Sequence, residues 1–274
     1  MTSNVTLPRY ETWQENVGVH TDCLAIQWKA SQKKDRKHIR SENSEDALTW
    51  QTFRSLEAAG LLDRFVADLL GLADHYITYY WQRPHHRYDI DPIIDRALAE
   101  VEPFHRQHGR QHTETDLILR GEHTLIAAEI KLGYKKRKIT GWRQARNSPI
   151  VDDYEPHARQ LVKDMTHWKQ EVARFAQLYK NLFLGRRLSE LWSATNQPLE
   201  LHLLAVVNGA TQEKKPDGSI WTYQDEFEAF RQSTAFRRDA LHLLTWQQIR
   251  DWILTQHSPH LSFGQDRLIH HPLL

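Results

Sequence analysis

The stretch that decides the fold reads Thr115-Asp116-Leu117-Ile118-Leu119-Arg120-Gly121-Glu122-His123-Thr124-Leu125-Ile126-Ala127-Ala128-Glu129-Ile130-Lys131. Two apolar runs flank a polar turn that contains Gly121, a pattern typical of a β-hairpin. Residues two apart in a strand share a face, so we expect Glu129 and Lys131 to point the same way. Asp116 is expected to meet them from the neighbouring strand. Two carboxylates and a lysine on one face suit a divalent metal ion and a phosphate ester, which makes phosphodiester hydrolysis the leading hypothesis.

Spacing alone does not select this site. A carboxylate, any residue and then a lysine also occurs at Asp35-Arg36-Lys37, which lacks apolar alternation, and at Glu213-Lys214-Lys215, which leads into a turn signal. Only Glu129 ends a run that is expected to be buried, where a carboxylate is costly unless it is paired or binds a metal ion. Asp116, Glu129 and Lys131 are therefore the candidate catalytic residues, although Asp at a hairpin rim and Lys at a strand end are also common without any function.

Composition indicates a folded protein with a large core. The chain has 274 residues, is 40% hydrophobic and contains ten Trp, nine Tyr and nine Phe, so disorder is not expected. Its one cysteine, Cys23, excludes an internal disulfide framework and a multi-cysteine metal site. No apolar run reaches the ~20 residues that span a membrane, and the N-terminus lacks the pattern of a signal peptide. We therefore expect a cytoplasmic protein without a membrane partner.

The distribution of charge is more informative than the net charge of +1. From Lys131 to Arg146 there are seven Lys or Arg and no acidic residue. Such a run is often only a solvated loop, but next to a phosphodiester site it could neutralise backbone phosphates without reading sequence. The candidate DNA-backbone contacts in this run are Lys135, Lys136, Arg137, Lys138, Arg143 and Arg146.

Helical and strand patterns alternate along the chain, which predicts an α/β fold. Expected helices begin at Ser44, an N-cap residue, and at Pro92 and Pro156, with the last extending to about residue 183. Further helical segments are expected at 61–72, 225–236 and 246–254, and strands at 77–81, 199–207 and 240–244. We expect residues 1–40 to form an N-terminal arm of unknown role and residues 41–274 a single domain.

Three further residues are candidates for the same site. Glu45 lies in the first turn of the Ser44 helix, where helix electrostatics alone would also favour an acidic residue. Glu114 lies two residues before Asp116 and shares its face if the strand extends that far. Gln160, one turn into the helix after the basic run, is within reach of the same pocket, although helical Gln is usually on the surface.

Asp116, the hairpin and Glu129-Ile130-Lys131 together resemble the catalytic core of PD-(D/E)xK nucleases, the restriction-endonuclease-like superfamily. Thr115 stands where that motif often has proline, and the segment from Ser44 to Trp50 resembles the first helix of bacterial members. The resemblance implies a mixed central β-sheet flanked by helices, with Glu45 completing the metal site. Members related to RecB carry a tyrosine four residues after the glutamine that Gln160 resembles, whereas this chain has Asp164 there.

The same resemblance implies a Mg²⁺-dependent DNA endonuclease of the restriction or defence type, with Mn²⁺ as a substitute ion. Asp116, Glu129 and Glu45 would hold one or two ions, and Lys131 would orient the attacking water or stabilise the developing negative charge. A structure-specific or end-dependent repair nuclease and a catalytically inactive DNA-binding protein with the nuclease fold are the alternatives. Cutting both strands at one place often needs two active sites, so we expect a homodimer.

Overall fold

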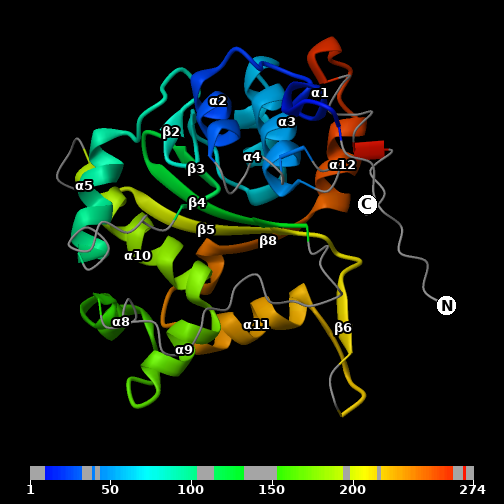
Figure 1. The fold of residues 1–274 in the computed structure, drawn as a ribbon. Helices are drawn as coiled ribbons and strands as arrows, with labels where there is room; N and C mark the ends of the chain where they lie inside the picture. Colours follow the sequence, from blue (N-terminus) through cyan, green and yellow to red (C-terminus); the bar gives the residue numbers. More distant parts are fainter. Residues whose placement is uncertain are drawn as a thin grey trace.

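A six-stranded mixed β-sheet forms the centre of the molecule (Figure 1). The computed structural model describes residues 10–32, 39–40, 44–103, 114–132, 153–193, 198–214, 217–261 and 268–269. The strands lie in the order β2-β1-β3-β4-β5-β8. Their bounds are β1 Ile77–Tyr80, β2 Arg83–Pro84, β3 Leu117–Arg120, β4 Thr124–Lys131, β5 Glu200–Val207 and β8 Leu241–Thr245.

The expected hairpin is confirmed as β3 and β4. The two strands are antiparallel, with Leu117 opposite Ala128, so Asp116 comes just before β3 at the end of the sheet where Glu129 lies. β5 runs parallel to β4 on its other side and places Val207 opposite Lys131. The sheet is therefore antiparallel on the β1 side of β4 and parallel on the β5 side, and strands from both parts meet at the hairpin.

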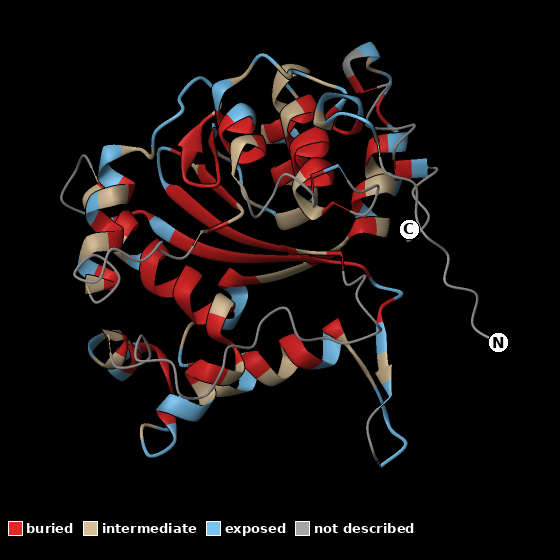
Figure 2. Ribbon diagram, in the orientation of Figure 1, coloured by how far each residue is buried: buried red, intermediate tan, exposed pale blue. Residues whose placement is uncertain are grey.

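Helices cover both faces of the sheet, as the α/β prediction requires (Figure 1). On one face lie α1 Trp13–Val17, α2 Leu24–Ser31, α3 Glu45–Ala58, α4 Leu62–Leu70 and α12 Trp246–Leu254. On the other lie α5 Pro92–Val101, α8 Glu155–Leu161, α9 Trp168–Arg174, α10 Ala176–Leu191 and α11 Tyr223–Ser233. Each layer of helices has its own apolar core against the sheet, and the strands between them are buried along most of their length (Figure 2).

The helix predicted to begin at Ser44 is confirmed as α3. The Ser44 hydroxyl accepts a hydrogen bond from the backbone N–H of Ala47 at 3.1 Å, which satisfies one of the free donors of the first turn. Trp50, Phe53 and Leu56 are fully buried on its inner face. Packing of this face against the sheet fixes the N-terminus of α3, and with it Glu45.

The single long helix predicted from Pro156 to about residue 183 is wrong, because the structure divides this segment into α8, α9 and α10. After α8 the backbone leaves the helix to pair Val162 with Thr234. The Thr234 hydroxyl donates to the carbonyl of Leu161 at 2.8 Å, and Asp164 accepts from the N–H of Thr166 at 2.8 Å. These bonds compete with helical ones, so an unbroken periodicity of apolar residues did not produce an unbroken helix.

The segment predicted as an N-terminal arm carries the helices α1 and α2. Ala25 and Ile26 of α2 are fully buried and belong to the same apolar core as α3. The hydroxyl of Thr12 caps α1 in a capping box with Glu15. This part of the segment therefore packs against the α/β domain, and the functional role of residues 1–40 stays open.

A second, two-stranded sheet is formed by β6 Gln212–Lys214 and β7 Ile220–Thr222. It follows β5 and extends away from the central sheet (Figure 1). Glu213 and Lys214 lie on β6. The copy of the carboxylate-x-lysine pattern that begins at Glu213 therefore starts on a strand, but this strand lies outside the central sheet. The remaining short elements are the 3₁₀ helices η1 Arg238–Ala240 and η2 Pro259–Leu261.

The helix α10 lies unusually close to the sheet. A Cβ atom on Gly185 would come within 2.6 Å of Leu201 Cδ1 and 3.5 Å of Ala127 Cβ, so any larger residue would have to displace the Leu201 side chain between the helix and strands β4 and β5. This close approach brings the preceding turn of α10 up to the hairpin. No helix in the described part of the chain is both long enough and apolar enough to cross a membrane.

Candidate active site

Three carboxylates and one lysine converge at the end of the hairpin. Glu45 comes from the first turn of α3, Asp116 from the residue before β3, and Glu129 and Lys131 from β4. The Lys131 Nζ lies 2.7 Å from Glu129 Oε1, 3.8 Å from Asp116 Oδ2 and 4.0 Å from Glu45 Oε2. The structure thus brings together the four residues that sequence analysis selected as the core of a metal site.

Each of the three carboxylates has one oxygen held by an N–H donor. Asp116 Oδ2 accepts from the backbone of Ile130 at 2.8 Å, and Glu45 Oε2 accepts from the backbone of Leu132 at 2.9 Å. Glu129 Oε2 accepts from the side-chain amide of Asn181, also at 2.9 Å. Because α3 and β3 are both tied to the backbone of β4, the carboxylates hold their positions relative to one another.

The exposed fraction of these side chains rises from 2% for Glu129 to 14% for Lys131, 21% for Asp116 and 41% for Glu45. Burial raises the pKa of Glu129 to about 7, and the nearby charge of Asp116 adds to the rise. Burial also raises the pKa of Asp116, against the opposing effect of Lys131. For Glu45 the direction is the same, but solvent at its exposed surface weakens the effect.

Lys131 is the cation that balances this cluster. Burial lowers the pKa of its ammonium group, but the carboxylates of Glu129, Asp116 and Glu45 outweigh burial and hold the pKa well above its usual value. Lys131 therefore stays protonated throughout the physiological range. One ammonium group facing three carboxylates leaves an excess of negative charge, which favours a further cation.

A second ion network adjoins the first and includes Glu114. Lys29 of α2 is 5% exposed, pairs with Glu114 and lies 3.4 Å from Asp46 Oδ1. The indole N–H of Trp81 donates to the same Asp46 oxygen at 3.0 Å. Glu114 is therefore held by Lys29 rather than by the Lys131 cluster, although its charge and that of Asp46 lie close enough to Asp116 to influence it electrostatically.

Sequence analysis missed three buried residues that adjoin the carboxylates from the other helical layer. Asn181 of α10 is 1% exposed and bonds Glu129 directly. Lys180, beside it, is 4% exposed, and burial lowers its pKa against the attraction of Glu102 and Glu129. Tyr223 begins α11 and is 2% exposed; burial raises its pKa, and the charges of Glu45 and Glu129 raise it further. These residues lie 51 or more positions from Glu129 and belong to helical patterns, so no local signal links them to it.

The carboxylate set suits a hard divalent ion such as Mg²⁺, which prefers oxygen ligands. Among the residues that the structure describes, Asp116 Oδ1 and Glu45 Oε1 accept no hydrogen bond, and the buried Oε1 of Glu129 faces the Lys131 ammonium group at 2.7 Å. No group of three or more His, Cys, Asp or Glu in these ranges is arranged to hold a metal ion in this structure, and the ammonium group of Lys131 lies within 4.0 Å of all three carboxylates. The oxygen donors are of the type that Mg²⁺ prefers.

Two other groups of predicted site residues lie away from this cluster or outside the described ranges. Gln160 is exposed on α8, and the hydrogen bonds of Glu129 and Asp116 go to Asn181 and to Ile130. The basic residues Lys135, Lys136, Arg137, Lys138, Arg143 and Arg146 fall outside the described residues, as does the Asp35-Arg36-Lys37 copy. Their predicted contacts with DNA stay predictions.

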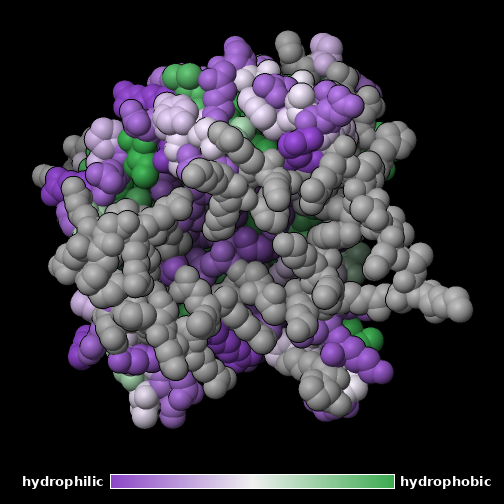
Figure 3. Space-filling model, viewed as in Figure 1, coloured by the Kyte–Doolittle hydropathy of each residue, from purple (hydrophilic) through white to green (hydrophobic). Residues whose placement is uncertain are grey.

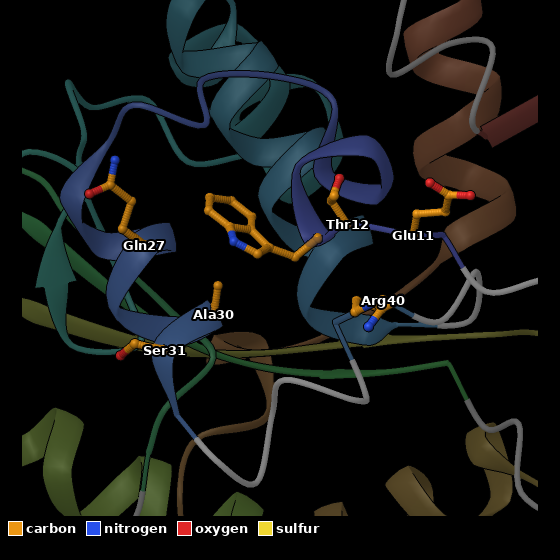
Figure 4. A pocket seen from close by; sticks show the side chains of 7 residues that line it. Glu11, Thr12, Gln27, Ala30, Ser31 and Arg40 are labelled. Atoms are coloured by element: carbon orange, nitrogen blue, oxygen red, sulfur yellow. The ribbon is translucent and has the colours of Figure 1, made fainter.

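A surface pocket of about 490 Å³ lies elsewhere, between α1, α2 and Arg40 (Figure 4). It is lined by Glu11, Thr12, Trp13, Gln27, Ala30, Ser31 and Arg40, and includes none of the clustered carboxylates. In the view of Figure 3 most of the described surface is hydrophilic, with only small apolar patches. Buried charge therefore distinguishes the candidate active site.

Comparisons with protein-family models, with curated proteins and with solved structures give no match to this chain.

Proposed function

We propose that this protein is a Mg²⁺-dependent nuclease with a restriction-endonuclease-like core, and that it cleaves DNA phosphodiester bonds internally in restriction or defence. The observation that carries the proposal is the position of the Lys131 Nζ within 4.0 Å of Asp116, Glu129 and Glu45. Structural ion pairs are usually made between single partners on the surface. Here a nearly buried lysine faces three carboxylates that come from α3, from the residue before β3 and from β4, and each carboxylate accepts a hydrogen bond from an N–H donor.

The excess of carboxylates argues for a metal rather than for a purely structural ion network. Asp116, Glu129 and Glu45 would hold the ion through their carboxylate oxygens. Bound Mg²⁺ would supply charge to the phosphoryl oxygen and lower the pKa of a bound water. Burying two or more like charges without such an ion is costly, as the pKa of about 7 for Glu129 indicates.

Lys131 has the complementary role in the proposed reaction. Its ammonium group remains protonated, so it can face the negative charge that develops on the phosphoryl oxygens as water attacks phosphorus. The phosphorus–oxygen bond to the departing alkoxide breaks, and the alkoxide takes up a proton. Lys131 would have to leave the space between the carboxylates before the metal and substrate bind, since its Nζ is 2.7 Å from Glu129 Oε1.

DNA is the proposed polymer because the resemblance to PD-(D/E)xK nucleases implies it, and the adjacent basic run can bind a phosphate backbone. A test combines supercoiled circular DNA and linear DNA with the purified protein across a titration of Mg²⁺. Cleavage of the circle to discrete products supports the endonuclease. Progressive loss of linear DNA alone would favour an end-dependent nuclease, and binding without cleavage would favour an inactive DNA-binding protein.

Two isosteric variants make the assay specific for the site. Glu129→Gln removes the buried carboxylate, and Glu122→Gln removes an exposed one from the turn of the same hairpin. We expect cleavage to depend on Mg²⁺, to stop with a chelator, to be lost in Glu129→Gln and to persist in Glu122→Gln. Cleavage by Glu129→Gln at the wild-type rate would contradict the proposal.

A further inference from the structure

Asn181 is a buried polar residue that reaches the hairpin from the opposite helical layer. It lies on α10 one turn before Gly185, the residue whose lack of a side chain lets this helix approach β4 and β5. Its amide lies between two residues of the hairpin region, Thr115 and Glu129. All three side chains are at most 2% exposed, so every polar group in this chain of contacts needs a partner.

The donor and acceptor roles in this chain of contacts are determined by chemistry. An ionised Glu129 can only accept, so the amide nitrogen of Asn181 must face it, at 2.9 Å from Oε2. The amide oxygen then faces Thr115, whose hydroxyl donates to it at 2.8 Å. A flipped amide would direct Oδ1 at the Glu129 carboxylate, so the carboxylate fixes the orientation, and the Thr115 hydroxyl, which can donate or accept, donates to the amide oxygen that this orientation turns toward it.

This arrangement gives the Glu129 carboxylate an N–H hydrogen-bond donor, which the other two carboxylates obtain from the backbone. Asp116 and Glu45 are held by the N–H groups of Ile130 and Leu132, two residues of or next to β4. Glu129 itself lies on β4, and no backbone N–H of the described residues donates to its carboxylate. Asn181 supplies the missing donor, and it does so at Oε2, which leaves Oε1 to face the Lys131 ammonium group at 2.7 Å.

We propose that Asn181, oriented by Thr115, is a positioning residue that holds Oε2 of Glu129 and so presents Oε1 to the bound divalent ion. The inference rests on the proposed function, because it assigns Glu129 as a ligand. It also gives Thr115 a role that the proline more common at this position could not have, since proline has no hydroxyl. Hydrogen-bond partners of metal-binding carboxylates typically affect metal affinity by 10- to 100-fold.

The alternative is a purely structural role, in which the amide merely satisfies buried polar groups of the fold. Ser189 distinguishes the two roles, because it is also buried on α10 and donates to the carbonyl of Leu199 at 2.6 Å, about two turns from Asn181. Ser189→Ala removes a buried hydrogen bond from the same helix without touching the carboxylates. A structural role predicts similar consequences for both positions, whereas a positioning role predicts an effect on metal binding only at Asn181.

The test measures Mn²⁺ affinity of the full-length protein without DNA, by calorimetry and by the paramagnetic resonance signal of free Mn²⁺. We expect Asn181→Leu to weaken binding 10- to 100-fold and Thr115→Val to weaken it about 3- to 10-fold. Thr115→Ser keeps the hydroxyl and should stay within twofold of the wild type. Ser189→Ala should lower the urea midpoint but leave the affinity unchanged. In cleavage assays at saturating Mg²⁺, Asn181→Leu should lower kcat more than it raises KM for DNA.

An Asn181→Leu affinity within twofold of the wild type would overturn the inference, as would an equal loss in Ser189→Ala or a wild-type protein that binds no Mn²⁺. If Asn181→Leu fails to fold by circular dichroism, the milder pair Thr115→Val and Thr115→Ser decides the question. Asn181-dependent Mn²⁺ binding without DNA cleavage would support the positioning role and contradict the nuclease. DNA cleavage together with an unaltered Mn²⁺ affinity in Asn181→Leu would support the nuclease and contradict the positioning role.

Discussion

Asp74 holds the turn of the hairpin that carries Asp116 and Glu129. Its carboxylate accepts hydrogen bonds from the backbone N–H groups of Glu122, His123 and Thr124 at 2.9–3.0 Å, and from the Thr124 hydroxyl at 2.9 Å. A Cβ atom on Gly121 would overlap this carboxylate, so the glycine is needed for its close approach. Burial would raise the pKa of Asp74, but these donors outweigh it and lower the pKa from 3.8 to about 2.

The shift gives the magnitude expected for Asp74→Asn. A difference of about 1.8 pKa units corresponds to at most about 2.4 kcal/mol of folding free energy at pH 7. Because Asp74 is partly exposed, we expect about 1–2 kcal/mol. The folded-state pKa is the lower one, so this stability is fully present above pH 4. It is lost as the pH falls through about 2, and about half of it should remain at pH 3.

The assay is urea unfolding of the wild type and Asp74→Asn at pH 7 and pH 3, followed by circular dichroism. Asp89→Asn serves as the control, because Asp89 is exposed and accepts no hydrogen bond from the described residues. We expect Asp74→Asn to lose 1–2 kcal/mol at pH 7 and about half of that at pH 3, and Asp89→Asn to lose less than 0.5 kcal/mol. A loss below 0.5 kcal/mol in Asp74→Asn at pH 7, or one that grows at pH 3, would refute the reasoning.

Three further predictions concern packing and buried charge. Gly185→Ala places a Cβ 2.6 Å from Leu201 Cδ1, so overpacking of about 1–3 kcal/mol should exceed the gain of about 1 kcal/mol in helix propensity; a rise in the urea midpoint would contradict this. The raised pKa of Glu129 means that its contribution to stability is present below about pH 4.5 and is lost as the pH rises through about 7. Metal-free Glu129→Gln should therefore gain stability relative to the wild type between pH 5 and pH 8, and calorimetric melting that shows a pH-independent difference would exclude this. Lys29→Met should cost about 3–5 kcal/mol in urea unfolding, because it leaves the partly buried Glu114 without its cation. A cost below about 1 kcal/mol would show that the pair is not needed.

The hairpin and the clustering of Asp116, Glu129 and Lys131 could be predicted because their signals are local. Alternating apolar runs, a turn glycine and a two-residue spacing fix which side chains share a face before any tertiary contact is known. The N-terminus of α3 was likewise predictable from Ser44, whose capping bond is made within its own helix. Glu45 could be placed at that terminus, but its membership of the carboxylate cluster was predicted only through the resemblance. Its hydrogen bond from the backbone of Leu132, 87 residues away, was not predicted.

The parts that sequence reasoning got wrong or missed depend on long-range contacts. Apolar periodicity continues through the breaks between α8, α9 and α10, but the pairing of Val162 with Thr234 interrupts the helix from 72 positions away. Asn181 looks like an ordinary helical residue in sequence, and Lys29 falls in the segment predicted as an N-terminal arm. Their roles follow from which strands and helices the fold brings together, which no spacing within a single segment encodes.

The most direct test of the central claim is the rate of Mg²⁺-dependent cleavage of supercoiled DNA by Lys131→Met, compared with Lys214→Met. Lys131 is the cation among the three carboxylates, whereas Lys214 is an exposed lysine on β6. We predict that Lys131→Met lowers the cleavage rate by roughly a hundredfold or more while it still folds and binds Mn²⁺, and that Lys214→Met cleaves like the wild type. Undiminished cleavage by Lys131→Met would contradict the claim that this cluster carries out the reaction.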